Sequence, residues 1–206
     1  MSYDAETLAA LASGELITRD ILTVHGKTLG GSAKTFVYWT GEDNITVNVA
    51  DPEGGSPISR NAVGGATLLN VPPIIDAIGF EVRSITLGLD HTSTATGSPM
   101  DMVFGNNVRV ARVEIHRAAF DPETWNLVST AHLLFTGRVD GASVDDAAAG
   151  DEGGLSLEAI SSAIELTKVN PAMESDEQQK LRDGDRFRQH ADTAAQVEAW
   201  WGQAKQ

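Results

Sequence analysis

The sequence predicts a mainly β fold: an antiparallel β-barrel or sandwich with a short N-terminal helix and a helical C-terminal arm. Roughly seven to nine short segments alternate apolar and polar residues, which is the period of a half-buried strand. They recur about every 8–12 residues, as in sandwiches and barrels. No helical stretch of about ten or more residues separates them, which disfavours an alternating β/α fold. We therefore expect an N-terminal helix over 1–15, a β domain over 16–171 and a C-terminal arm over 172–206.

The first element that the pattern predicts is a helix over residues 4–13. Leu8 and Leu11 stand three residues apart and so share one helical face, and Gly14 is a natural stop signal. This apolar face has two interpretations. The helix either packs on its own domain or docks on a neighbouring subunit.

The strands follow from residue 16 onward, where the apolar period changes to two. Alternation is strictest in 45–49 and 108–117. In the longer segment 78–89 the apolar positions change parity, and a bulge near Arg83-Ser84 would turn both sets of side chains to the interior. The expected strands lie near 22–25, 36–39, 45–49, 66–71, 78–89, 108–117, 131–139 and 155–159, with Ile164 and Leu166 extending or following the last.

Turn-forming residues separate these strands and end the β region. We expect loops at 51–57, 92–99 and 145–154, and an antiparallel hairpin over 108–139. Asn170-Pro171 closes the β region, because proline cannot donate to a strand ladder. Helical character then returns at Ser175–Arg182 and Thr193–Trp201.

Composition narrows the possible functions. The chain of 206 residues has 15 basic and 29 acidic residues, a net charge of −14, which disfavours a protein that grips phosphate backbones. It contains no cysteine, so thiolate metal sites, disulfides and a cysteine nucleophile are excluded. The acidic start and the lack of a long apolar run predict neither a secretory signal nor a membrane span, so we expect synthesis in the cytoplasm.

One arrangement could hold a divalent metal. His116 and His132 stand on the two arms of the expected hairpin, on its more polar face, and cross-strand pairing could join them to Glu114. Histidines on facing strands are far more often surface or interface residues. The sequence therefore favours no metal and no cofactor.

Other catalytic patterns are missing. The acidic loop with Asp145, Asp146, Asp151 and Glu152 lacks EF-hand spacing and is best interpreted as a solvated loop. No phosphate-binding glycine loop and no G-x-S-x-G nucleophile motif occurs. We therefore expect a protein that is not an enzyme.

The aromatic residues suggest binding. Tyr38, Trp39 and Trp125 could form an apolar platform for sugars, or they could serve core and turn packing. Trp200 and Trp201 would be exposed near a flexible end, so they either fold back on the domain or dock into an adjacent chain.

Six segments carry a family resemblance through their order and spacing. They are FVYWTG at 36–41, an arginine at 60 followed by GGATLL at 64–69, VRSITL at 82–87, VEIHRA at 113–118, LFTGRVD at 134–140, and a closing pattern of LTKVNPAM at 166–173, SD at 175–176, GDRF at 184–187 and WG at 201–202.

In this order the segments resemble a family of tail-tip proteins from tailed phages and prophages of alphaproteobacteria. These are small relatives of hub and distal-tail components, which also occur in gene transfer agents. Some related sequences carry C-terminal cysteines, and their absence here speaks against a metal cluster.

The resemblance implies a structural component of the virion, located at the tail tip. Such a protein would form a ring with copies of itself, either a hexamer or a trimer, and would contact tail-tube, hub and baseplate proteins. DNA would pass through the ring without specific binding, and an acidic lining would repel phosphates. Within this role we expect Trp200, Trp201, Phe187 and Arg186 to dock between subunits. The alternative function is a carbohydrate- or receptor-binding β domain at the tip.

Overall fold

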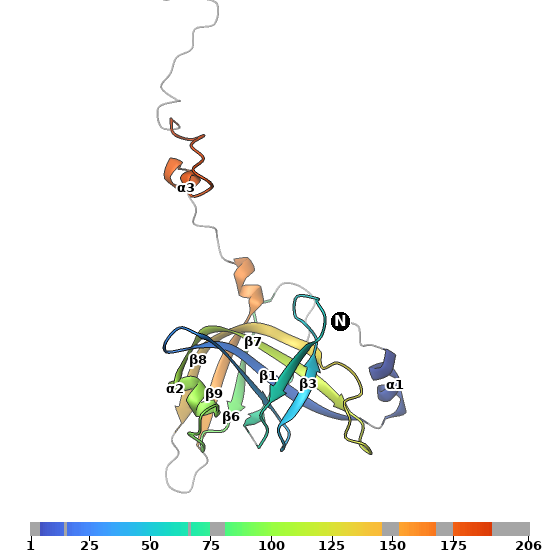
Figure 1. Ribbon diagram of the computed structural model, residues 1–206. Coiled ribbons are helices and arrows are strands. Elements are labelled where there is room, and N and C mark those ends of the chain that lie inside the picture. The colour runs from blue at the N-terminus through green and yellow to red at the C-terminus, as the bar shows by residue number, and fades with distance from the viewer. Residues whose placement is uncertain are drawn as a thin grey trace, which may run out of the picture. The chain divides into compact units, whose positions relative to one another are not determined.

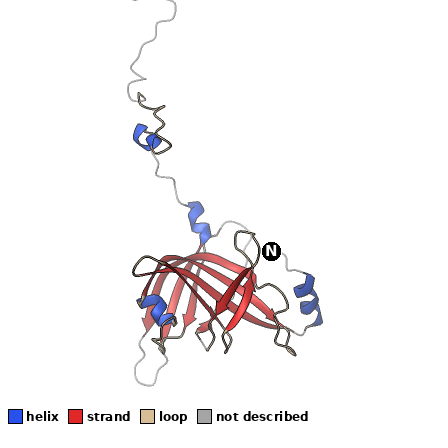
Figure 2. Ribbon diagram, viewed as in Figure 1, coloured by secondary structure: helices blue, strands red, loops and turns tan. Residues whose placement is uncertain are grey.

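Antiparallel β-structure dominates the computed structural model (Figures 1 and 2), which describes residues 5–14, 16–65, 67–74, 81–145, 153–167 and 175–190. The chain divides into two compact units, 1–167 and 168–206. The elements of the first unit are α1 (Ala5–Ser13), β1 (Ile17–Thr28), β2 (Ala33–Trp39), β3 (Ile45–Val49), β4 (Ile58–Ala62), β5 (Leu68–Asn70), β6 (Ser84–Leu89), α2 (Pro99–Phe104), β7 (Asn106–Phe120), β8 (His132–Asp145), β9 (Gly154–Ser161) and the 3₁₀-helix η1 (Ser162–Thr167). The second unit contains α3 (Asp176–Lys180).

Seven strands form the main sheet, in the order β2-β1-β7-β8-β9-β6-β5. All the neighbouring pairs are antiparallel, and the expected hairpin over 108–139 is confirmed as β7 and β8. The sheet curls without closing into a barrel. A short segment links its two edges: the Val63 amide donates to the Val37 carbonyl of β2 (2.9 Å), and the Thr67 carbonyl accepts from the Asp90 amide beside β6 (3.1 Å).

A second, two-stranded sheet of β3 and β4 packs on one face of the main sheet. Its outer end is fastened by two backbone hydrogen bonds, from the Ala50 amide to the Ala131 carbonyl (2.9 Å) and from the Ala131 amide to the Asn48 carbonyl (2.8 Å). The mainly β, sandwich-like fold that the sequence predicts is therefore confirmed, with a curled sheet as the larger layer.

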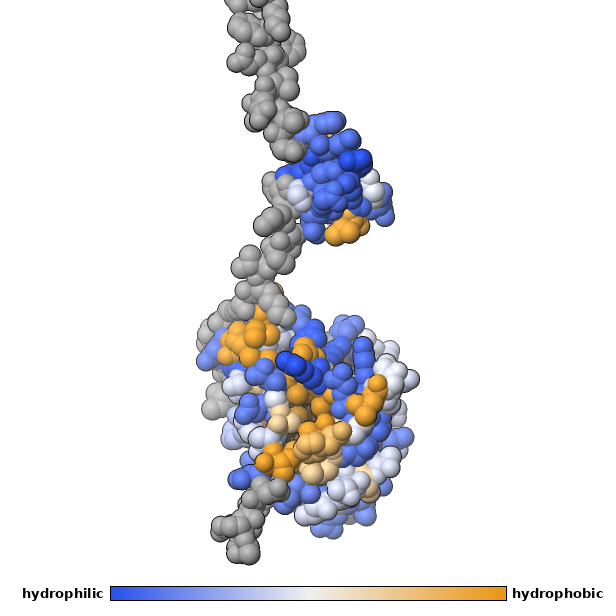
Figure 3. Space-filling view, turned by 90° about the vertical axis from the view of Figure 1, so that its left-hand side faces the viewer, coloured by the Kyte–Doolittle hydropathy of each residue, from blue (hydrophilic) through white to orange (hydrophobic). Residues whose placement is uncertain are grey.

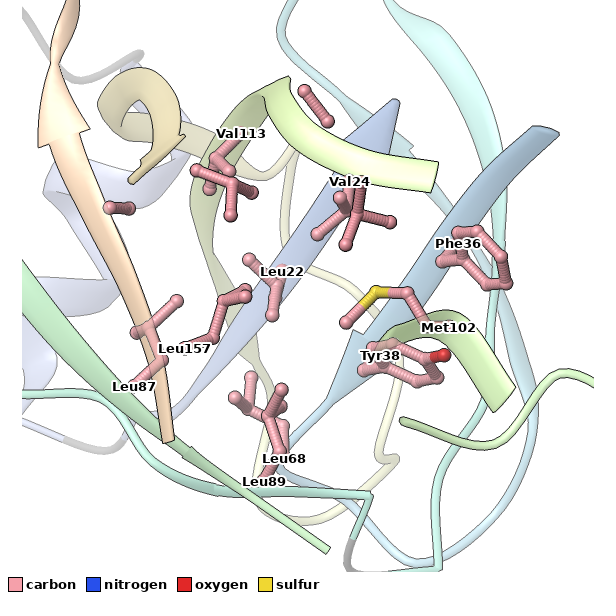
Figure 4. Close-up of a cluster of buried hydrophobic side chains, with 14 of the residues drawn as sticks. Leu22, Val24, Phe36, Tyr38, Leu68, Leu87, Leu89, Met102, Val113 and Leu157 are labelled. Carbon is pink, nitrogen blue, oxygen red and sulfur yellow. The ribbon is translucent and has the colours of Figure 1, made fainter. Parts of the chain in front are cut away.

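The largest apolar core lies inside the curl (Figure 4). Side chains from distant parts of the sheet meet there: Leu22 of β1 joins Leu87 of β6 and Leu157 of the neighbouring β9, and each is 0% exposed. Met102 of α2 closes the same cluster beside Tyr38. Because successive side chains along a strand point to opposite faces of the sheet, every second residue points into this core and the residues between them point to the opposite face.

The N-terminal helix forms close to its expected position. It ends before Gly14, whose φ of 77° is the left-handed conformation that glycine favours at a helix end. It touches its own unit through the hydroxyls of Thr7 and Ser129, 2.6 Å apart, while Leu8 and Leu11 stay exposed.

Several sequence predictions need correction. Within the expected strand 78–89 only Ser84–Leu89 is a strand; 81–83 lie outside any strand, and 78–80 lie outside the described residues. The predicted extension at 164–166 is instead the 3₁₀-helix η1.

Two further elements were not predicted. The strand β4 reads IleSerArgAsnAla, in which only the alternate positions face inward, so its apolar pattern is weak. The helix α2 begins where a loop was expected to end. Ser98 caps it, accepting a hydrogen bond from the Asp101 amide (3.2 Å), and Pro99 fits its first turn.

Candidate functional site

The structure does not bring His116, His132 and Glu114, the residues considered as metal ligands, together as a site. The register places His132 opposite Arg117, and His116 opposite Leu133. His116 Nε2 lies 2.9 Å from the Ala50 carbonyl, to which the neutral ring donates. Among the residues that the structure describes, no three His, Asp or Glu side chains form a group that could hold a metal ion.

Glu114 is instead the centre of a buried ionic network beneath the small sheet. Its side chain is 2% exposed. Its Oε1 lies 3.0 Å from His25 Nε2 and 3.1 Å from Arg112 Nε, and its Oε2 lies 3.8 Å from Arg60 Nη2. Because these partners come from β1, β7 and β4, the network joins the two sheets.

The electrostatics of this network have clear physical causes. Burial alone would raise the pKa of Glu114, but the His25 hydrogen bond and the charge of Arg112 together lower it. Burial also lowers the pKa of His116, whose Nδ1 is buried without a hydrogen-bond partner. Glu114 is therefore held as a carboxylate between its three partners, and the nearby His116 ring is held neutral. An ion-paired carboxylate that joins two sheets suits fastening the layers together.

A groove of about 580 Å³ opens on the same face of the main sheet. Trp39 and Phe120 line it, and their ring centroids lie 5.9 Å apart at an interplanar angle of 42°. Trp39 is only 7% exposed, so the two rings belong to the second apolar cluster as well as to the groove. The volume lies within the range of small-ligand sites.

One wall of the groove is the loop 40–44 between β2 and β3, which several hydrogen bonds hold in place. Trp39 Nε1 donates to the Asp43 carbonyl (2.6 Å), and the Gly64 amide donates to Asn44 Oδ1 (3.1 Å). Gly41 lies so close that an added Cβ would meet the Trp39 ring at 2.1 Å. This wall is therefore preorganised rather than loose.

Trp125, in the turn between β7 and β8, also lines the groove. Asp121 Oδ1 accepts from the amides of Glu123 (2.8 Å) and Thr124 (2.9 Å), and the Trp125 amide donates to the Asp121 carbonyl (2.9 Å). The bonds from the Thr124 and Glu123 amides to its carboxylate lower the pKa of Asp121. Trp125 is 61% exposed, and its φ of 56° is a strained, left-handed value for a bulky residue.

The groove brings together two of the three aromatic residues suggested as a platform and corrects the place of the third. Trp39 and Trp125 line it together, but Tyr38 points to the other face, into the main core, where its hydroxyl donates to the Gly97 carbonyl (2.9 Å). Burial raises the pKa of Tyr38. Consecutive strand residues point to opposite faces, so the sequence itself separates Tyr38 from Trp39.

Sequence reasoning missed the polar part of the groove. Arg19, Thr40, Glu42 and Asp43 also line it. Arg19 lies on β1, while the other three follow β2 in the chain. No motif connects them, and the only available signal was the polar run directly after the aromatic strand.

The expected docking residues fall in two groups. Phe187 is 87% exposed, and Arg186 Nη2 is paired with Asp176 Oδ2 at 3.1 Å. Trp200 and Trp201 lie outside the described residues. In the acidic loop Asp145 ends β8, whereas Asp146, Asp151 and Glu152 lie outside the described residues.

Both units expose large apolar side chains. Figure 3 shows apolar patches on the side of the first unit that carries α2, where Phe104 is 64% exposed, and one on the second unit. In the second unit the exposed residues are Phe187 and Leu181, the latter 78% exposed and not predicted. Isolated exposed residues are common, whereas contiguous apolar patches mark contact surfaces.

Comparison with known proteins does not assign a family: no family model matches the chain, and no curated protein does. None of the described helices is long and apolar enough to cross a membrane. The resemblance to tail-tip proteins therefore stays a prediction from the motifs.

Proposed function

We propose that the protein is a structural subunit of a phage tail tip that closes a ring with copies of itself, as a distal-tail or hub layer around the DNA passage. The observation that carries the proposal is the exposure of Phe187 and Leu181 in the second unit. Two large apolar side chains on so short a described segment favour a partner that covers them.

The described part of the second unit is held together by polar contacts. Ser175 caps α3, accepting from the Gln178 amide (3.2 Å), and Gln179 Nε2 donates to Asp185 Oδ2 (2.8 Å). Lys180 pairs with both Asp176 and Glu177. Such contacts fix the local backbone while leaving its apolar side chains outward, which is the form of an anchor.

A ring places different demands on the two units. Each subunit of a cyclic assembly offers two distinct surfaces to its neighbours, so an anchor on one copy needs a receptor surface on the next. Phe104 is exposed on the first unit and is available for such a contact. The face of the main sheet that carries the small sheet of β3 and β4 is a second available surface. The net charge of −14 per copy suits a lumen that DNA crosses without binding.

The experiment removes the anchor and follows incorporation into particles. Phe187→Ala combined with Leu181→Ala should leave a folded first unit but prevent incorporation at the distal end of the tail, as seen by electron microscopy of purified particles. Gln178→Ala, an exposed polar position on α3, is the matched control and should incorporate normally.

A deletion of the C-terminal residues tests the same proposal of ring assembly independently. Deletion of residues 174–206 should yield a soluble β domain that does not assemble. Normal assembly of the deletion, or detection of the wild-type protein only in lysate and never in particles, would reject the proposal.

A further inference from the structure

We propose that the groove lined by the loop 40–44 and Trp125 binds a neutral pyranose sugar. This activity does not depend on ring formation, because all of the groove's lining residues belong to the first unit. It gives the aromatic platform a defined site, made by Trp125 and Trp39 with a polar rim.

The apolar half of the site is the exposed indole of Trp125. Its turn is closed by three hydrogen bonds to Asp121, and it holds the residue at φ 56° while 61% of the residue faces solvent. A bulky side chain in this conformation is strained, and such strain concentrates at ligand sites. The C–H face of a pyranose ring is flat and apolar, so it can stack on this indole while Trp39 and Phe120 line the groove beneath.

The polar half of the site is set by Arg19, Glu42 and Asp43. A guanidinium donates hydrogen bonds and carboxylates accept them, so the rim offers both partners that adjacent sugar hydroxyls require. Glu42 and Asp43 are exposed and Arg19 is half-buried, so all three stand where a ligand in the groove would meet them.

The charges of the rim select the class of sugar. Two carboxylates, in a chain of net charge −14, oppose sialic acids, uronic acids and phosphorylated sugars. The Arg19 guanidinium opposes a cation stacked on the indole, which the aromatic and acidic residues alone would favour. A neutral polyhydroxyl ring is the ligand that meets neither repulsion.

The site is also held in shape before any ligand binds. The Thr40 amide donates to the Asp20 carbonyl (3.1 Å), and Thr40 Oγ1 accepts from the Asp20 amide (3.1 Å). An added Cβ at Gly64 would meet the carbonyl oxygens of Glu42 and Asp43 at 2.5 Å. Because the backbone that carries both carboxylates is fixed, binding does not have to order this part of the main chain.

The experiment uses the labelled full-length protein on a glycan array with neutral hexose, deoxyhexose and N-acetylhexosamine oligosaccharides beside sialylated, uronic-acid and phosphorylated ones. We expect signals on a subset of the neutral glycans. Silence across the whole array, or signals confined to charged glycans, would overturn the proposal.

Variants then locate the site, with calorimetry against the neutral oligosaccharide that gave the strongest signal. Trp125→Gly removes the indole and relieves the backbone, so its melting temperature should not fall, while its affinity drops by about tenfold or more. Phe104→Ala removes an equally exposed aromatic residue elsewhere and should bind like the wild type. Equal binding by Trp125→Gly and the wild type would overturn the assignment.

The same assay distinguishes a protein occupant of the groove. If a second copy of this chain filled the groove, Trp125→Gly would change the oligomeric mass in light scattering and no array signal would depend on Trp125. That pair of results would refute the sugar site, while failure of ring assembly alone would leave it standing.

Discussion

The two faces of the main sheet are built from the same strands but differ in chemistry. The face inside the curl is closed by strands from the whole sheet and by α2, and its cluster is apolar almost throughout. The opposite face is covered only in part, by β3 and β4. It combines an apolar cluster, the buried network around Glu114 and the groove beside Trp125.

The difference follows from how completely each face is covered. A closed apolar face maximises burial and tolerates no polar group without a partner. A partly covered face leaves an edge at which charged and aromatic side chains stay reachable. We infer that the inner face supplies stability and the outer face supplies contacts, and the following changes test that division.

The largest expected effect is on the inner face. Leu157→Ala removes a fully buried side chain from the centre of the core, where its neighbours come from three or more strands and cannot easily collapse. We expect a loss of about 3 kcal/mol in the free energy of unfolding, measured by urea denaturation. Leu29→Ala, at a 79% exposed position, should change it by less than about 0.5 kcal/mol.

The next effect is on the outer face. Glu114→Gln removes the carboxylate that His25, Arg112 and Arg60 share, which leaves cationic groups without their counter-charge. Since His25 and Arg112 are partly solvated, we expect a loss of about 2 kcal/mol rather than the larger cost of a fully buried pair. An unchanged denaturation midpoint would show that the network does not fasten the two sheets.

The pH dependence should also come from the outer face. The folded state lowers the pKa of His116, so below about pH 6.5 the unfolded chain binds a proton that the folded chain does not. Stability should therefore fall as the pH is lowered from 7.5 to 5.5, with a slope of at most about 1.4 kcal/mol per pH unit. Glu114, whose pKa is also lowered, adds a loss of the same sign below about pH 4.5.

A variant without a titrating side chain at position 116 tests whether His116 causes this pH dependence of stability. His116→Gln keeps an N–H donor for the Ala50 carbonyl but does not titrate, so it should flatten the dependence between pH 7.5 and 5.5. The measurement is the denaturation midpoint at each pH for both proteins. A slope that persists in His116→Gln would exclude His116 as its source.

The smallest effect concerns the strained turn. Trp125→Gly should be about 1 kcal/mol more stable than Trp125→Ala, because only glycine adopts a φ of 56° without strain. The difference between the two variants isolates the backbone, since both lack the indole. Equal melting temperatures would mean that the turn relaxes when the ring is removed.

The strands were predictable where alternation was strict. Val113 and Ile115 alternate with Glu114 and His116 in the sequence, and the structure places the two pairs on opposite faces. The alternation did not reveal which face would be buried, and here both are. It failed at β4, whose inward positions include Arg60, because only the network with Glu114 makes that residue acceptable there.

The candidate site was predictable only in fragments. Trp39 and Trp125 were both recognised as aromatic candidates, but 86 positions of chain separate them, and no spacing rule brings a turn and a strand end together. The polar rim was not recognised at all, since Arg19 and Glu42 meet only because β1 and β2 are neighbours in the sheet.

The sequence by itself determined the class of fold, because the period of two and the spacing of turns are local properties that act before any long-range contact forms. It also determined the acidic charge and the absence of thiol chemistry. The tertiary structure decided which residues share a face, a network or a groove. Those groupings depend on strand order and on the curl of the sheet, which arise from burying all the strands together.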